Sequence, residues 1–479
     1  MTPTPARRVP LWVALLFVAG VLVALAVLRW QAPMIGAAAV GIPLVLASYL
    51  RGRVRSARTV AVVAVAGALL GLAWSLVTGD IVAEAYDVAL GSGVTVDHTV
   101  RDGLLVSVGG ALVMLVPAVL AYRSVRDPLT GLMFGALGAA SFTAVTTLIR
   151  LAPQLATGVS TRERPVAGLL AEAVIQGVAV PVLAAAVGAM VGAALGSQRR
   201  RAVALAASVV VALVLYGCLG LVEAAPLAQG VQVVAHLGLA ALAVLAMRTV
   251  LRAGSGDQAA DVPQEVAVLL PVGVGVVIAA AIASAVSLVI TPEIPNYRCP
   301  PDCGQPPLGT PVAINPRFTA ADGSFSVSYP GPGTAYRAVL NPDGVTLDFV
   351  AGDTGTVELF GEPANGRTPQ AITEELIARS YPNATVDYEI PHAAVGYQPG
   401  YGVYADDYPQ DSTGTYTRLR IMVMVAVKND FALVAAAVGP YHEFSPSFGI
   451  GHPSGANLQL AMDVGKYVNS FRWRGDPPR

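Results

Sequence analysis

Charged residues are scarce in this chain of 479 residues, because Lys, Arg, Asp and Glu together make up only 13% of it. Soluble proteins contain roughly 25%. Hydrophobic residues make up 54%, and this balance excludes a protein folded entirely in water. A lipid bilayer is therefore the expected surrounding of much of the chain. Lysine is the scarcest basic residue, since only Lys428 and Lys466 are present among 30 basic residues. Together with abundant Ala, Val and Gly, this bias indicates a GC-rich bacterial genome.

The few charges are distributed unevenly along the chain. Residues 1–290 contain 18 basic and 12 acidic residues, a net of +6, whereas residues 291–479 contain 12 and 19, a net of −7. We therefore expect two modules: a transmembrane helical bundle over 1–290 and a soluble α/β domain over 317–475. The Pro-rich stretch 291–316 between them is typical of a stiff tether.

Long apolar stretches predict about nine transmembrane helices, each long enough to cross a ~30 Å hydrocarbon core. They lie at about 11–28, 33–50, 59–78, 103–121, 130–149, 167–196, 202–222, 228–247 and 266–290. With a cytoplasmic N-terminus the inner segments hold 13 arginines and the outer loops of the membrane half hold 5. The positive-inside rule thus predicts a multi-pass protein of the bacterial plasma membrane with its C-terminal domain outside the cytoplasm.

Cysteine is rare, with three residues in the chain. Cys299 and Cys303 follow the last span, in a compartment where a disulfide is stable, and we expect them to be bonded to one another. Two unrelated thiols or half of a metal site are the alternatives. Cys218, inside the seventh span, is expected to be a small packing residue.

Small residues recur every four positions in three of the predicted spans, a spacing that lets helix backbones approach closely. This pattern predicts a compact bundle; the residues are Gly67, Gly71, Gly131, Gly135, Ala139, Gly188, Gly192 and Gly196.

The stretch DPLTGLMFGALGAASFTAVTT, from Asp127 to Thr147, resembles the core signature of the PrsW family of intramembrane metalloproteases. In that family a D-P-x-D-G-L-x-Y-G-A motif opens a helix that ends in F-A-x-x-E-N. The resemblance covers about residues 100–250 and is carried in register by Asp127, Pro128, Gly131, Leu132, Gly135, Ala136 and Phe142.

The residues that would perform the family's chemistry are not matched. The Glu-Asn pair falls on Thr146 and Thr147, and the upstream Glu-Glu pair falls near Gly109 and Gly110. A zinc hydrolase needs ligands with lone pairs and a carboxylate to take a proton from the metal-bound water, and Gly and Thr are poor substitutes. We therefore expect a degenerate site, a pseudoenzyme without metal or other cofactor.

Three ionisable residues lie within or next to the apolar stretches, and ionisable groups buried in a membrane are functional candidates. We expect Glu172 and Glu223 to lie at helix ends and His236 to be neutral and hydrogen-bonded to a neighbouring helix. One histidine and two peripheral carboxylates make a poor metal site and an equally poor proton relay.

From Phe318 onward the sequence is typical of a soluble α/β domain. Strand-like runs occur at GSFSVSYP, GVTLDFVAG and GTVELFGEP, and Thr368 with Pro369 predicts a helix start. Residues 418–438 form two β-rich runs joined at Asn429 and Asp430, which predicts a hairpin.

This order resembles the PsbP-like α/β sandwich, which also occurs in secreted lipoproteins of the LpqN type. The resemblance spans about residues 315–475 and implies an α+β sandwich with an antiparallel sheet, a module for binding or scaffolding. It is carried by Phe325, Ser326 and Pro330 in the opening strand and by Ser470, Phe471 and Trp473 at the end.

The segment GYQPGYGVYADDYPQ contains Tyr397, Tyr401, Tyr404 and Tyr408. Tyrosines on a loop are suited to recognition. The same residues are equally compatible with a pair of strands that is interrupted by glycines and has one buried face. The strand interpretation is favoured, and the four tyrosines are the candidate binding surface.

These features favour a non-catalytic membrane scaffold or sensor that presents its outer domain to a protein, peptide or glycan of the cell envelope. We expect no nucleic-acid partner, and a homo-oligomer is compatible with the sequence. One alternative is a PrsW-like metalloprotease with a displaced active site. The other is a transporter subunit, although few polar residues lie within the spans to line a hydrated path.

Overall fold

The computed structural model describes residues 9–51, 57–84, 90, 99–125, 127–155, 158–160, 165–197, 201–255, 265–266, 269–290, 315–331, 334, 336–349, 355–408, 418–440 and 464–477. The chain forms two compact units. The first comprises residues 1–85, 96–291 and 410–415, and the second comprises 86–95, 292–409 and 416–479. Cys299 and Cys303 lie outside the described residues, so their disulfide stays a prediction.

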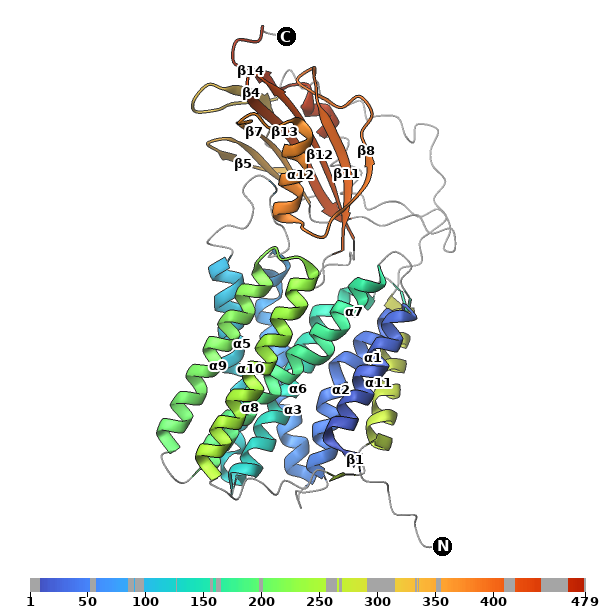
Figure 1. Ribbon diagram of the computed structural model, residues 1–479, viewed down its shortest axis with the longest axis vertical. Coiled ribbons are helices and arrows are strands. Elements are labelled where there is room, and N and C mark those ends of the chain that lie inside the picture. The colour runs from blue at the N-terminus through green and yellow to red at the C-terminus, as the bar shows by residue number, and fades with distance from the viewer. Residues whose placement is uncertain are drawn as a thin grey trace. The chain divides into compact units, whose positions relative to one another are not determined.

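The first unit is a bundle of helices (Figure 1). Its elements are α1 (Leu11–Val27), α2 (Gln31–Arg51), α3 (Ala57–Glu84), η1 (Thr99–Val106), α5 (Ser107–Leu120), η2 (Ala121–Ser124), α6 (Pro128–Leu155), α7 (Val166–Val174), η3 (Ile175–Ala179), α8 (Val180–Gly196), α9 (Arg201–Ala224), α10 (Gln229–Ser255) and α11 (Leu269–Ile290).

Eight of the nine predicted spans correspond, within the described residues, to helices long and apolar enough to cross a membrane. The first predicted span forms α1, which has 17 residues and covers about 26 Å at the helical rise. Large apolar side chains are exposed on the outside of the bundle, among them Leu69 at 60%, Val214 at 60% and Ile282 at 59%. Cys218 is also exposed, so it does not pack inside the bundle as expected.

A short strand pair joins two distant parts of this unit. β1 (Val9–Pro10) pairs antiparallel with β2 (Glu265–Val266). Because β1 directly precedes α1 and β2 lies just before α11, both helices begin at the same end of the bundle (Figure 1). Nine alternating spans require this arrangement.

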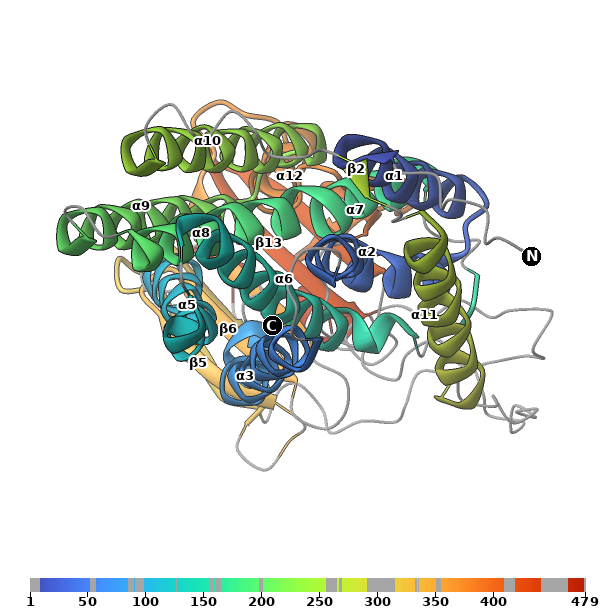
Figure 2. The ribbon, with the colours of Figure 1, turned by 90° about the horizontal axis from the view of Figure 1, so that it is seen from below.

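Helix α6 occupies the centre of the bundle and contacts α2, α3, α5 and α8 (Figure 2). A Cβ added to Gly131 would collide with the carbonyl oxygen of Gly192, and one added to Gly135 would collide with that of Gly188. The two backbones are therefore in direct contact. This confirms the close helix approach predicted from the small-residue spacing.

The second unit contains a seven-stranded, fully antiparallel sheet of order β5-β6-β7-β13-β12-β11-β8 and a three-stranded sheet of order β14-β4-β3. A two-stranded ribbon pairs β9 (Ala394–Val395) with β10 (Gln398–Pro399). The other elements are β3 (Arg317–Thr319), β4 (Phe325–Ser328), β5 (Tyr336–Asn341), β6 (Gly344–Phe349), β7 (Thr356–Pro363), α12 (Pro369–Ser380), β8 (Thr385–Glu389), β11 (Tyr401–Asp407), β12 (Leu419–Lys428), β13 (Phe431–Pro440) and β14 (Arg472–Trp473).

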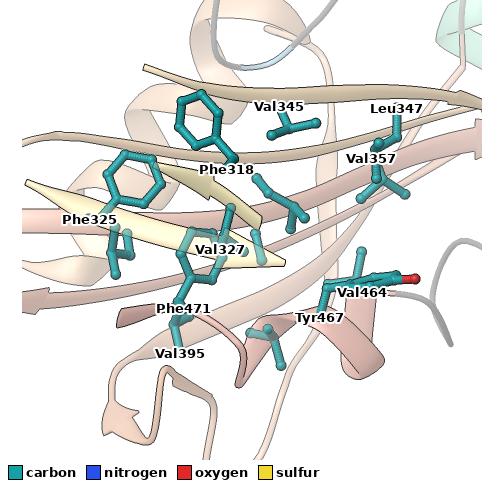
Figure 3. Packing of buried hydrophobic residues seen from close by; sticks show 14 of the residues in the cluster. Phe318, Phe325, Val327, Val345, Leu347, Val357, Val395, Val464, Tyr467 and Phe471 are labelled. Atoms are coloured by element: carbon teal, nitrogen blue, oxygen red, sulfur yellow. The ribbon is translucent and has the colours of Figure 1, made fainter. Parts of the chain in front are cut away.

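The large sheet has a separate hydrophobic core on each face. On one face Phe325 and Val327 of the small sheet pack with Val357 and with Val464 and Phe471 from near the C-terminus (Figure 3). The other face packs against α12 through a second cluster, which includes Ile372, Leu376, Val403, Ile421 and Val434. This arrangement is an antiparallel α+β sandwich.

Local sequence signals set two features of this domain. Thr368 caps α12, because its side chain accepts a hydrogen bond from the Ala371 N–H at 3.2 Å. Asn429 and Asp430 have φ of 53° and 57°, the left-handed values that a two-residue hairpin turn between β12 and β13 requires. Both the predicted helix start and the predicted hairpin are confirmed.

Leu90 belongs to this second unit although it lies in the sequence range predicted for the bundle. It is fully buried in the same cluster as Ile372 and Leu376. Its carbonyl oxygen accepts a hydrogen bond from Arg379 Nη2 at 2.8 Å. The module boundaries predicted from composition therefore omit one short segment, because a single apolar residue between two spans gives no compositional signal.

Candidate functional site: a cavity in the helical bundle

A cavity of about 400 Å³, with a mainly apolar wall, lies within the first unit, and its size is in the ~300–1,000 Å³ range of small-molecule sites. It is bounded by α3, α5, α6, α8 and α9 together with η1 and η3. Its lining combines apolar and aromatic side chains with hydroxyl groups, an amide and two charged groups: Trp74, Ser75, Thr78, Gly79, Val106, Ser107, Gly110, Phe142, Thr143, Thr146, Thr147, Ile149, Arg150, Gln176, Val180, Tyr216, Leu219 and Glu223.

Three of the four positions that the PrsW resemblance identified as degenerate line this cavity, namely Gly110, Thr146 and Thr147. The fourth, Gly109, lies against Trp74. A Cβ on Gly109 would be 2.6 Å from Cη2 of the indole, and a Cβ on Gly110 would be 3.0 Å from Nε1. Trp74 thus occupies the space that longer side chains at both glycines would need.

Arg150 of α6 and Glu223 of α9 form an ion pair at the partly exposed edge of the cavity. Nη1 donates to Oε1 at 3.3 Å and Nη2 donates to Oε2 at 3.1 Å. The side chains are 24% and 16% exposed. Both carboxylate oxygens therefore accept from one guanidinium, in the bidentate geometry typical of Arg. Arg150 is one of the five arginines that the sequence assigned to outer loops, Glu223 was expected at a helix end, and nothing indicated that they pair.

His236 of α10 lies beside this ion pair. Its Nδ1 is 2.7 Å from the carbonyl oxygen of Gln232, and a carbonyl only accepts, so Nδ1 carries a proton. Nε2 lies 3.9 Å from Oε1 of Glu223. Nδ1 therefore bonds within its own helix. The expected interaction with a neighbouring helix is on the side of Nε2, which faces the carboxylate of Glu223 in α9.

Glu172 is only 2% exposed. It lies in the first turns of its helical segment, as expected, and its side chain is buried because α7 packs against α1, α2 and α10. Four residues further along the same continuous helical segment, Gln176 is equally buried and lines the cavity.

The ionisable groups near the cavity do not fit a zinc site. Catalytic zinc takes three protein ligands, whereas Glu223 and His236 provide two, and Glu223 is bonded to Arg150. Within the described part of the chain, no three His, Cys, Asp or Glu side chains are grouped to hold a metal ion.

Three hydroxyl groups of the cavity lining donate to atoms of the protein. Thr78 donates to the carbonyl of Trp74 at 2.9 Å, and Thr146 donates to that of Thr143 at 3.0 Å. Tyr216 donates to Sδ of Met114 at 3.1 Å. Because each proton is used within the protein, the oxygens of Thr78 and Thr146 remain as acceptors. The Tyr216 oxygen already interacts with the hydroxyl of Thr143.

Two π-helical segments contribute to the cavity. Val106 ends η1 and Gln176 lies in η3, and both residues line the cavity. The π-helix is rare and is found frequently at functional sites. The sequence carries no signal that identifies either segment.

In the second unit, the candidate tyrosines do not form one surface. The segment is the strand β11, as favoured, and Tyr401 and Tyr404 are three positions apart on it, so their side chains lie on opposite faces. Tyr401 packs at the α12 side and Tyr404 at the other core. Tyr404 also stacks on Tyr388 of β8, with ring centroids 4.9 Å apart. Tyr397, with φ of 64°, is 63% exposed, and Tyr408 is half-buried.

Two neighbouring carboxylates at the end of β11 have opposite electrostatic surroundings. Burial opposes ionisation of Asp406, but hydrogen bonds from Arg418 at 2.5 Å and Arg420 at 3.0 Å lower its pKa. Burial raises the pKa of Asp407 to about 6. Asp407 is therefore the carboxylate in this domain whose charge is costly.

Comparisons with known proteins give little guidance. No family model matches the chain, and no curated protein matches it. A crystal structure of a protein from Bacteroides thetaiotaomicron is similar over 34% of this chain and 49% of its own length, with 13% identity and a TM-score of 0.21. The chain thus spans about half of that protein. The PrsW-like and PsbP-like resemblances receive no support from these comparisons.

Proposed function

We propose that the protein is a non-catalytic sensor or scaffold of a bacterial plasma membrane. Its N-terminus is cytoplasmic, and the sandwich domain lies outside and binds a protein, peptide or glycan of the cell envelope. The apolar side chains exposed on the bundle, such as Leu69 and Ile282, support the membrane location, since water would not favour so much exposed apolar surface.

The observation that carries the non-catalytic role is the bidentate ion pair. A hydrolase needs a carboxylate that is free to bind a metal or to take a proton. Here both oxygens of Glu223 accept from Arg150, and Trp74 fills the space beside Gly109 and Gly110. These contacts favour a structural or ligand-binding role for the cavity.

The test of the binding role is site-specific photo-crosslinking in intact cells. A photoreactive residue is placed at Tyr397, 63% exposed, and as a matched control at Leu340, 56% exposed on the edge strand β5. We expect an adduct of one fixed mass from Tyr397 and none from Leu340. Absence of any adduct, or identical adducts from both positions, would contradict binding at this end of the domain.

A PrsW-like hydrolase with a displaced site is the second candidate. The 3.9 Å approach of His236 Nε2 to Glu223 offers it two ligands, one fewer than catalytic zinc takes. Such an enzyme must nevertheless purify with stoichiometric zinc and lose its activity in His236→Gln, and a metal-free preparation would rule it out. The transporter alternative rests on the cavity in the bundle, and uptake by proteoliposomes that contain the full chain tests it directly.

A further inference from the structure

We propose that the cavity in the bundle binds a net-neutral ligand that carries a primary ammonium group next to an acid group. The head group of phosphatidylethanolamine and a free amino acid or phosphoethanolamine share this chemistry. The proposal concerns the helical bundle and does not depend on the partner of the sandwich domain.

The ammonium group follows from two hydroxyl acceptors of the lining. Thr78 and Thr146 use their hydroxyl protons inside the protein, so their oxygens are available to N–H donors. A primary ammonium has three such donors. The carboxylate of Glu223 adds a negative charge, and the aromatic lining residue Trp74 is the ring type that best attracts a cation.

The acid group follows from Arg150. Its guanidinium is bound to one carboxylate at the edge of the cavity, a geometry that a ligand carboxylate or phosphate reproduces. A ligand with both groups exchanges one internal ion pair for two pairs with the protein. A ligand with a single charge would break the ion pair between Arg150 and Glu223 and replace only one of its two halves, which is costly at a partly buried site.

Three further features agree with a binding site at this place. The volume of about 400 Å³ accommodates a head group. The edge at Arg150 and Glu223 is partly exposed, so a ligand can reach it. The two π-helical segments, η1 and η3, both contribute lining residues, and irregular helix of this kind is often retained for function.

The experiment is native mass spectrometry of the full-length protein with equal amounts of phosphatidylethanolamine and phosphatidylcholine. The two lipids have the same net charge and the same phosphate, but the choline nitrogen has no N–H donor. We expect phosphatidylethanolamine to be preferred by about tenfold or more, the usual value of hydrogen bonds to a charged group. Equal binding of the two lipids would overturn the proposal.

Variants locate the preference in the cavity. Thr78→Val and Thr146→Val each remove one acceptor while the β-branch remains, and each should reduce the preference several-fold. Thr249→Val is the matched control, because Thr249 makes the same type of hydroxyl bond, to the Ala246 carbonyl at 2.7 Å, on an exposed part of α10. If the two cavity variants retain the full preference, or if Thr249→Val loses it equally, the cavity is not the site.

A soluble competitor separates the two sources of the ligand. Glycerophosphoethanolamine has the head group without the acyl chains. Displacement of bound phosphatidylethanolamine by this compound indicates that the free zwitterion is sufficient, and lack of displacement indicates that a lipid is required. Because the readout is lipid binding by the bundle, its failure is distinguishable from failure of the crosslinking test at Tyr397.

Discussion

The buried carboxylate of Asp407 makes the stability of the sandwich domain depend on pH in an unusual direction. Burial raises its pKa from 3.8 to about 6, so the folded protein binds a proton there more tightly than the unfolded chain does. The stabilising effect of protonation is fully present below the unfolded pKa, near pH 4. It is lost as the pH rises through the folded pKa, and above about pH 6 the loss is complete.

The magnitude follows from the difference between the two pKa values. At 1.36 kcal/mol per pKa unit, a change from 3.8 to about 6 corresponds to about 3 kcal/mol at pH 7. Asn has nearly the shape of a protonated Asp and carries no charge. We therefore expect Asp407→Asn to stabilise the domain by about 3 kcal/mol at pH 7 and by less than about 1 kcal/mol at pH 4.

Hydrogen exchange of the full-length protein measures this locally. Wild type and variant are compared at the same pH, so that the intrinsic exchange rates cancel, and the protected amides of β12 and β13 report opening of the sheet. Asp343→Asn, an exposed carboxylate in the turn between β5 and β6, is the matched control and should change nothing at either pH. Equal protection of Asp407→Asn and wild type at pH 7 would refute the proposed cost of burying this charge.

Three further changes have defined outcomes in thermal or denaturant unfolding of the full chain. Gly135→Ala places a methyl group against the α8 backbone and should lower the free energy of unfolding by about 1–3 kcal/mol. Gly238→Ala in α10 is its control, because nothing lies within 4 Å of an added Cβ there, and this change should be neutral or stabilising. Arg418→Ala removes one partner of buried Asp406 and should lower the free energy of unfolding by about 3 kcal/mol at pH 7. Because the ion pair lowers the pKa of Asp406, this loss should become smaller at acidic pH, where the Asp406 carboxylate is protonated. Thr368→Ala removes the cap of α12 and should cost about 1 kcal/mol, measured most directly as faster amide exchange in the first turn.

Local and compositional features of the fold were predictable from the sequence. Apolar length located the helices, and alternation with turn residues located the hairpin at Asn429 and Asp430. Small-residue spacing indicated close approach of helices, which the structure shows at Gly135 and Gly188. Each of these depends on residues close together in the chain, or on a periodicity that a single helix displays.

The candidate site was predictable only in part. The resemblance to PrsW proteins directed attention to Gly110, Thr146 and Thr147, which do line one cavity. It gave no indication of Trp74 or of the ion pair between Arg150 and Glu223, and the sequence did not show that packing between helices buries Glu172. The four tyrosines looked like one surface, but the alternation of strand β11 divides Tyr401 from Tyr404.

The sequence by itself determined which segments are apolar helices, which are strands, and how the charge divides between two modules. Only the tertiary structure decided that Arg150 meets Glu223, 73 positions away, and that the hydroxyls of Thr78, Thr146 and Tyr216 donate inward. The physical reason is the distance along the sequence over which each interaction acts. Helix and strand formation follow from hydrophobic burial and backbone geometry within a few turns, whereas an ion pair or a cavity requires the packing of several helices to bring distant side chains together.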